Sequence, residues 1–103
     1  MTNSKALSLL GLAAKAGRLV SGEFATEKAV KSRDAFLVIV AQDASDNTKK
    51  MFSNMCTYYE VPILMLEDKK KLGHAIGKEF RASIAVQDSG FAKAILSQVQ
   101  KEC

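Results

Sequence analysis

The sequence is poor in residues that form crosslinks or metal centres. It has 103 residues, of which two are cysteines and one is a histidine. Cys56 and Cys103 lie far apart and form no C-x-x-C pair, so we expect reduced thiols rather than a disulfide. A zinc or iron–sulfur site needs ligands grouped at short spacing, and neither the cysteines nor His74 belong to such a group. We therefore expect no metal site and no cofactor.

Signals for membrane insertion or export are also missing. No apolar run approaches the roughly 18 residues of a membrane span. The N-terminal stretch carries neither a basic leader nor a small-residue cleavage site. We expect a soluble, cytoplasmic protein without a membrane partner.

The common motifs of catalysis do not occur. Neither G-x-x-x-x-G-K-[ST] nor G-x-G-x-x-G is present, which disfavours nucleotide-dependent enzymes. Cys56 lies on an apolar helical stripe, where a thiol behaves as a small hydrophobe with a raised pKa. His74 stands in a charged segment typical of a surface histidine. Because no acid–base pair stands out, we predict that the protein is not an enzyme.

The chain does contain enough apolar residues for one hydrophobic core. Hydrophobic residues make up 48% of the sequence, which predicts a single domain over residues 1–103. Lys and Arg number 15 against 11 Asp and Glu, for a net charge of +4. This surplus favours a polyanionic partner, although many proteins that bind no nucleic acid have a similar excess.

Hydrophobic periodicity predicts helices and strands in alternation. Apolar residues recur at helical spacing over residues 4–15, and Gly17 then ends that helix. The continuous apolar run 36–41 is typical of a central strand covered on both faces, and 61–66 reads as a second buried strand. The other predicted elements are short strands at 18–21 and 83–86, a helix at 23–31, a helix capped by Ser45 that buries Phe52, Met55, Cys56 and Tyr59, a short helix capped by Asp68, and a closing helix that buries Ala92, Ile95, Leu96 and Val99. This order predicts an α/β fold with a sheet between helix layers.

One candidate binding element lies where the first strand meets the second helix. Gly22 after a strand leaves backbone N–H groups at a helix start, beside Lys28 and Lys31. Such a helix start suits phosphate or base-edge acceptors, but it can equally be an ordinary helix start with solvated charges. Arg18 precedes this element and Arg33 follows it.

A second candidate element is a polar loop near residue 80. It carries Lys78, Phe80 and Arg81, and an aromatic side chain among basic residues is a combination used for single-stranded or distorted RNA. A core contact is an equally good interpretation of Phe80. The lysine run 69–71 could also reach phosphates, although such short runs are usually solvated.

Several motifs, taken together, resemble one known family over nearly the whole chain. They are Leu10–Gly17, Gly22–Val30, Val40–Ser45, Val61-Pro62, and Leu72-Gly73 with Gly77. With them the sequence resembles the kink-turn RNA-binding ribosomal protein family, the L-seven-A-e type, and more closely its small bacterial branch of the YlxQ kind. The resemblance implies a three-layer α/β/α sandwich around a four-stranded mixed sheet.

The resemblance also implies where RNA would bind. In the family, a motif like G-x-N-E-x-x-K at the start of the second helix inserts beside tandem sheared G·A pairs. Gly22 and Lys28 match this motif, whereas Phe24 and Ala25 stand where the family has Asn and Glu. Each lost bidentate base contact costs about 1 to 3 kcal/mol of discrimination, so we hypothesise weaker or altered specificity.

The family's second contact is a loop that packs against flipped nucleotides, and it corresponds here to residues 78–82. Phe80 could stack on a base there, and Arg81 could bind phosphate. The predicted RNA-binding residues are Arg18, Gly22, Glu23, Phe24, Ala25, Thr26, Lys28, Lys31, Lys78, Glu79, Phe80 and Arg81.

These observations predict a monomeric, non-catalytic protein that recognises and stabilises kink-turn-like bent RNA, associated with the ribosome or another ribonucleoprotein. Two alternatives stay open. The first is a protein-interaction module on the same fold with weak or lost RNA specificity, suggested by the apolar Phe24 and Ala25. The second is a small enzyme that uses the glycine turn as an anion site.

Overall fold

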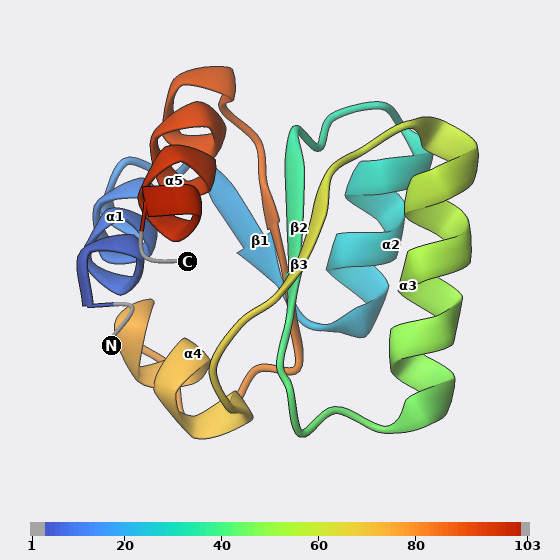
Figure 1. The fold of residues 1–103 in the computed structure, drawn as a ribbon, viewed down its shortest axis with the longest axis horizontal. Coiled ribbons are helices and arrows are strands. Elements are labelled where there is room, and N and C mark those ends of the chain that lie inside the picture. Colours follow the sequence, from blue (N-terminus) through green and yellow to red (C-terminus); the bar gives the residue numbers. More distant parts are fainter. Residues whose placement is uncertain (1–3, 102–103) are drawn as a thin grey trace.

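The computed structural model describes residues 4–101 as three layers, with one sheet between two groups of helices. Helices α2 and α3 cover one face of the sheet, and α1, α4 and α5 cover the other (Figure 1). The elements in chain order are α1 (Ser4–Lys15), β1 (Leu19–Ser21), α2 (Glu23–Lys31), β2 (Leu37–Val40), α3 (Asp46–Tyr59), β3 (Ile63–Met65), α4 (Lys69–Ala75), β4 (Ser83–Val86) and α5 (Ser89–Lys101). The predicted α/β/α sandwich is confirmed.

The four strands form one mixed sheet in the order β1-β4-β2-β3. Strand β4 is antiparallel to both of its neighbours, whereas β2 and β3 are parallel, with Val38 opposite Ile63. A parallel pair needs a crossover connection, and α3 provides it. The mixed four-stranded sheet that the resemblance implied is therefore present.

The two central strands hold the middle of the core. Every residue of β2 and of β4 is buried, as the continuous apolar run at 36–41 predicts for a strand covered on both faces. The prediction of a second buried strand at 61–66 is wrong for β3. Ile63 and Leu64 are half-buried and Met65 is 38% exposed, because β3 is an edge strand with a neighbour on one side only.

Local capping signals set the starts of two helices as predicted. The Ser45 hydroxyl accepts a hydrogen bond from the Thr48 N–H at 3.1 Å, and the Asp68 carboxylate accepts one from the Lys71 N–H at 2.8 Å. The longest helix, α3, has 14 residues and buries Phe52 against the core. Within residues 4–101, no helix has the length and apolar character that crossing a membrane requires.

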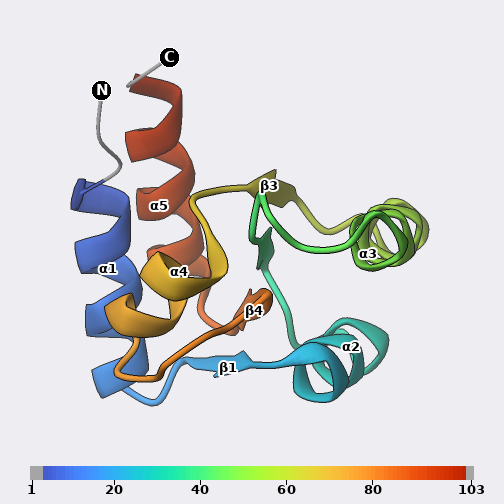
Figure 2. The ribbon, with the colours of Figure 1, turned by 90° about the horizontal axis from the view of Figure 1, so that it is seen from below.

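One end of the sheet gathers several connections. There the Gly22 N–H donates to the Ser83 carbonyl at 2.9 Å, and the Ala41 N–H donates to the Ala82 carbonyl at 2.9 Å. Seen from this end, the α4–β4 connection runs beside β1 (Figure 2). The ends of β1, β2 and β3 and the start of β4 thus bring segments together that are far apart in the sequence.

Candidate functional site

The junction between β1 and α2 is the first part of the site. Gly22 has φ 97° and ψ 156°, a conformation that residues with a side chain rarely adopt. Its carbonyl accepts the Thr26 N–H at 3.0 Å, so the glycine is itself the N-cap of α2. Among residues 4–101, no side chain caps the amides of this helix start, in contrast to the starts of α3 and α4. These first-turn N–H groups point toward the end of the sheet where the connections meet.

The α4–β4 loop is the second part, and one side chain ties it to the first. The Arg81 Nε–H donates to the Ser21 hydroxyl at 2.9 Å, and the same guanidinium donates from Nη1 to the Phe80 carbonyl at 2.7 Å. These two bonds occupy only part of a group that has five N–H donors. The loop therefore lies against the end of β1, immediately before Gly22.

Backbone bonds and a close contact hold the same loop against α4. The Lys78 N–H donates to the Gly73 carbonyl at 2.8 Å, and the Arg81 N–H donates to the Lys69 carbonyl at 3.1 Å. A Cβ atom placed on Gly73 would come within 2.5 Å of the Glu79 carbonyl oxygen and 2.8 Å of the Phe80 nitrogen. Only glycine permits this approach, which gives the Leu72-Gly73 motif a structural reason.

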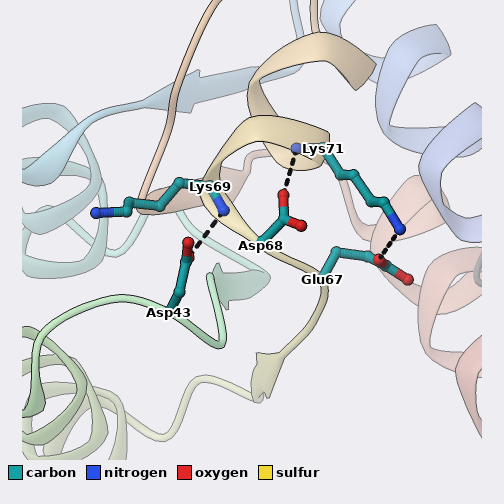
Figure 3. A network of polar contacts seen from close by, with 5 residues as sticks. All are labelled: Asp43, Glu67, Asp68, Lys69 and Lys71. Atoms are coloured by element: carbon teal, nitrogen blue, oxygen red, sulfur yellow. Dashed lines mark hydrogen bonds and ion pairs between the residues drawn. The ribbon is translucent and has the colours of Figure 1, made fainter.

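A polar network fixes the start of α4 beside the β2–α3 connection (Figure 3). The Asp43 carboxylate accepts the Lys69 N–H at 2.9 Å, and the Lys71 ammonium lies 3.5 Å from a Glu67 carboxylate oxygen. Next to this network is a hollow of about 470 Å³, lined by Asp43, Asp68, Lys69, Lys70 and Phe80. Phe80 is 58% exposed there, so the core contact considered for it is wrong.

Sequence reasoning missed two residues of this arrangement, Ser21 and Asp43. Their partners are 60 and 26 residues away in the chain, and a single sequence carries no signal for such pairing. For the lysine run 69–71 the sequence favoured solvated side chains, and the Lys71 side chain is 63% exposed while it forms an ion pair with Glu67.

The structure brings together eight of the twelve residues predicted to bind RNA. They are Gly22, Glu23, Phe24 and Ala25 at the start of α2, and Lys78, Glu79, Phe80 and Arg81 in the adjacent loop. Phe24 is 80% exposed, and Glu23, Lys78 and Glu79 are exposed as well. Lys28 is exposed one helical turn beyond Phe24, on the same side of α2.

Three predicted residues lie elsewhere. Thr26 is fully buried beneath the first turn of α2, so its side chain does not reach the surface as the prediction required. Arg18 is at the opposite end of β1 from Gly22, on the order of 13 Å away at 3.3 Å per residue, and its carbonyl accepts the Gln87 N–H. Lys31 is in the last turn of α2, about 12 Å along the helix from Glu23.

The charges on α2 are unequally paired. The Lys31 ammonium donates to the Glu27 carboxylate at 2.7 Å, and this hydrogen bond, together with the Glu27 charge, raises the pKa of Lys31. Lys28 has no ion-pair partner within the part of the chain that the structure describes. Lys28 is therefore the cation of this helix that a bound anion could use without first breaking an ion pair.

No cluster of three or more His, Cys, Asp or Glu side chains suited to a metal ion occurs among residues 4–101. Cys56 is buried in the stripe of α3, and burial raises the pKa of its thiol to about 11. The sheet end itself presents exposed cations, exposed carboxylates, the amides at the start of α2 and exposed aromatic rings.

Comparison with known proteins places this geometry in a family. Residues 4–96 match the model of the ribosomal protein L7Ae/L30e/S12e/Gadd45 family. The RNA-binding protein YlxQ of Bacillus subtilis is 42% identical over 97 residues, which cover 94% of this chain and 97% of that protein. The YlxQ protein of Enterococcus faecium is 43% identical over 89 residues, covering 86% of this chain and 85% of that one.

Solved structures agree with this match. A Bacillus halodurans protein of unknown function is 41% identical and superposes with a TM-score of 0.91, covering 93% of this chain and 97% of that one. The 15.5kD RNA binding protein of Giardia lamblia has a TM-score of 0.81 at 23% identity, over 98% of this chain and 90% of that one, and supports the fold alone. The chain belongs to the ribosomal protein L7Ae/L30e/S12e/Gadd45 family.

Proposed function

We propose that this protein is a monomeric, non-catalytic RNA-binding protein of the cytoplasm that recognises and stabilises kink-turn-like bent RNA in the ribosome or another ribonucleoprotein. The observation that carries the proposal is the Arg81–Ser21 hydrogen bond of 2.9 Å. It holds the α4–β4 loop against the start of α2, so the two segments expected to contact RNA form one surface. Two relatives that are more than 40% identical carry the name RNA-binding protein.

Each part of this surface has a chemical task in the proposal. The uncapped amides at the start of α2 and the Lys28 ammonium bind phosphate oxygens. The Arg81 guanidinium is anchored through Nε to Ser21, and its remaining N–H groups donate to phosphates of the RNA backbone beyond the bend. Glu23, which when ionised only accepts hydrogen bonds, suits amino groups of base edges rather than phosphates.

The protein would act by a population shift rather than by a chemical step. RNA alone samples the bent form, and a protein that binds only this form increases its population by its differential affinity. A rigid surface suits that task. The loop residues are fixed by backbone bonds to Gly73 and Lys69, and both parts of the surface are attached to the buried strand β4.

The first test compares a kink-turn RNA with the same RNA after its G·A pairs are replaced by Watson–Crick pairs, at two salt concentrations. We expect tighter binding to the kinked form at both concentrations. Equal, salt-sensitive binding to the two RNAs would mean that the protein binds RNA through its positive charge alone, without recognising the kink. No binding to either RNA would refute the proposed function.

A pair of lysine variants tests where RNA binds. Lys28→Ala should weaken binding and make its salt dependence shallower, because one phosphate contact is lost. Lys93 is also exposed but lies on α5, in the opposite helix layer (Figure 1), so Lys93→Ala should change neither quantity. Equal effects of the two substitutions would mean that the surface is assigned to the wrong side of the molecule.

The second candidate function is a protein-interaction module with weak or lost RNA specificity. The 80% exposure of Phe24 favours it, since a large apolar side chain at a helix start is what a protein partner could cover. Binding that is indifferent to both salt and RNA structure would support this function over the first.

A further inference from the structure

Phe24 has an unusual position for an apolar side chain. It is the second residue of α2, and its 80% exposure exceeds that of the other large hydrophobic residues found exposed, with Tyr58 next at 77%. None of the ring's neighbours on the helix covers it, although burying such a side chain would stabilise the fold. An exposed ring in this place is better explained by something that binds it than by packing within the chain.

Open space borders the Phe24 ring on more than one side. Two hollows of about 400 and 380 Å³ meet along the ridge made by Phe24 and Lys28, which line both of them. Ser32 lines both as well; the first also includes Glu27 and Lys31, and the second extends to Val20, Asp34 and Gln87. The hollows leave room for a flat group beside the ring, with a lysine one turn further along the helix.

The charge beside the ring decides which flat group fits. Phe24, Lys28 and Lys31 follow one another at spacings of four and three residues, so they share one side of α2. Glu27 is matched by Lys31, which leaves the Lys28 ammonium beside the ring without an ion-pair partner among the residues that the structure describes. An aromatic face beside a free ammonium complements a nucleotide, which combines a π-surface with a phosphate.

We propose that an unpaired nucleobase of the bound RNA stacks on Phe24 while the Lys28 ammonium binds an adjacent phosphate. This inference rests on the proposed function and narrows it. The preferred RNA would present, next to its bend, an unpaired base with a free face, and recognition there would use stacking in place of the base-edge contacts that Asn and Glu make in the family. Stacking is tolerant of base identity, so the protein would require an unpaired base without requiring a particular one.

The test combines variants of the protein with variants of the RNA. Phe24→Leu keeps an apolar side chain but removes the aromatic ring, Phe24→Tyr keeps the ring, and Tyr58→Leu removes a comparably exposed ring from α3. Each is titrated with the kink-turn RNA and with versions in which one unpaired nucleotide at a time is abasic. Thermal unfolding of each variant checks that the fold is retained.

We expect Phe24→Leu to weaken binding about tenfold, Phe24→Tyr to retain most of the binding because it keeps the ring, and Tyr58→Leu, which lies outside the proposed surface, to leave binding unchanged. One abasic substitution should cost the wild type about tenfold and cost Phe24→Leu nothing further, because both changes remove the same contact. If Phe24→Leu binds like the wild type while Lys28→Ala binds weakly, the stacking is refuted and RNA binding stands. If the wild type binds none of these RNAs, the proposed function fails, and the stacking fails with it.

Discussion

Replacing Gly73 by alanine tests whether the close approach of α4 to the α4–β4 loop shapes the site. The added Cβ would lie 2.5 Å from the Glu79 carbonyl oxygen and 2.6 Å from its carbon, and both are backbone atoms. The loop would have to retreat by roughly half an ångström to one ångström to reach ordinary contact distances. It cannot do so freely, because Lys78 and Arg81 are hydrogen-bonded to α4 on either side.

The expected loss of stability follows from two opposing effects. Alanine in a helix interior is favoured over glycine by about 1 kcal/mol, and overpacking a tight contact costs typically 1 to 3 kcal/mol. We therefore expect Gly73→Ala to lower the free energy of unfolding by up to about 2 kcal/mol. Urea denaturation measures this change as a lower midpoint at an unchanged m-value.

Gly90 in α5 provides the matched control. Its added Cβ would meet the end of the flexible Asp88 side chain at 3.1 Å, so Gly90→Ala should change the free energy of unfolding by less than about 1 kcal/mol. In Gly73→Ala, the amide NMR signals of residues 78–81 should also shift. A Gly73→Ala protein that is as stable as the wild type, with unchanged signals in this loop, would refute the reasoning.

Three further changes test other parts of the structure. Gly22→Ala forces a side chain into the conformation at φ 97°, at a cost of about 1 to 3 kcal/mol in urea denaturation, and an unchanged midpoint would contradict the assigned geometry. Ser45→Ala removes the hydroxyl that caps Thr48 and should cost about 1 kcal/mol, whereas Ser45→Asp should retain most of the stability. The pKa of Cys56 is raised from 9.0 to about 11 by burial, so its contribution to stability is fully present below pH 9 and is lost as the pH rises toward 11. In a Cys103→Ser background, this thiol should react with iodoacetamide far more slowly in the folded than in the unfolded protein at pH 8, and equal rates would show that it is not buried.

Local sequence signals predicted the elements of this fold well. The starts of α3 and α4 follow from Ser45 and Asp68, whose side chains cap amides only three residues away. The bounds of α2 follow from Gly22 at its start and from helix-forming composition up to Lys31. These features depend on neighbours within one or two turns, and the sequence displays such neighbours directly.

Local sequence signals did not predict which strands are central and which are at the edge of the sheet. The runs 36–41 and 61–66 are both apolar, yet Leu37–Val40 forms a central strand and Ile63–Met65 an edge strand. The number of neighbours that a strand has is a property of the assembled sheet, and its own composition does not specify it. Thr26 illustrates the same limit, because its helical position faces the core only after α2 has packed against the sheet.

The sequence by itself thus determined the order of helices and strands, the helix caps, and the two segments that carry cations and aromatic residues. Only the tertiary structure decided that the rings of Phe24 and Phe80 are exposed and that these segments adjoin. Arg81 and Ser21 are 60 residues apart and meet because β1 and β4 pair antiparallel, and Arg18 is excluded from the cluster because it lies at the far end of the same strand. Long-range pairing depends on the packing of the whole chain, so the site exists only in the assembled fold.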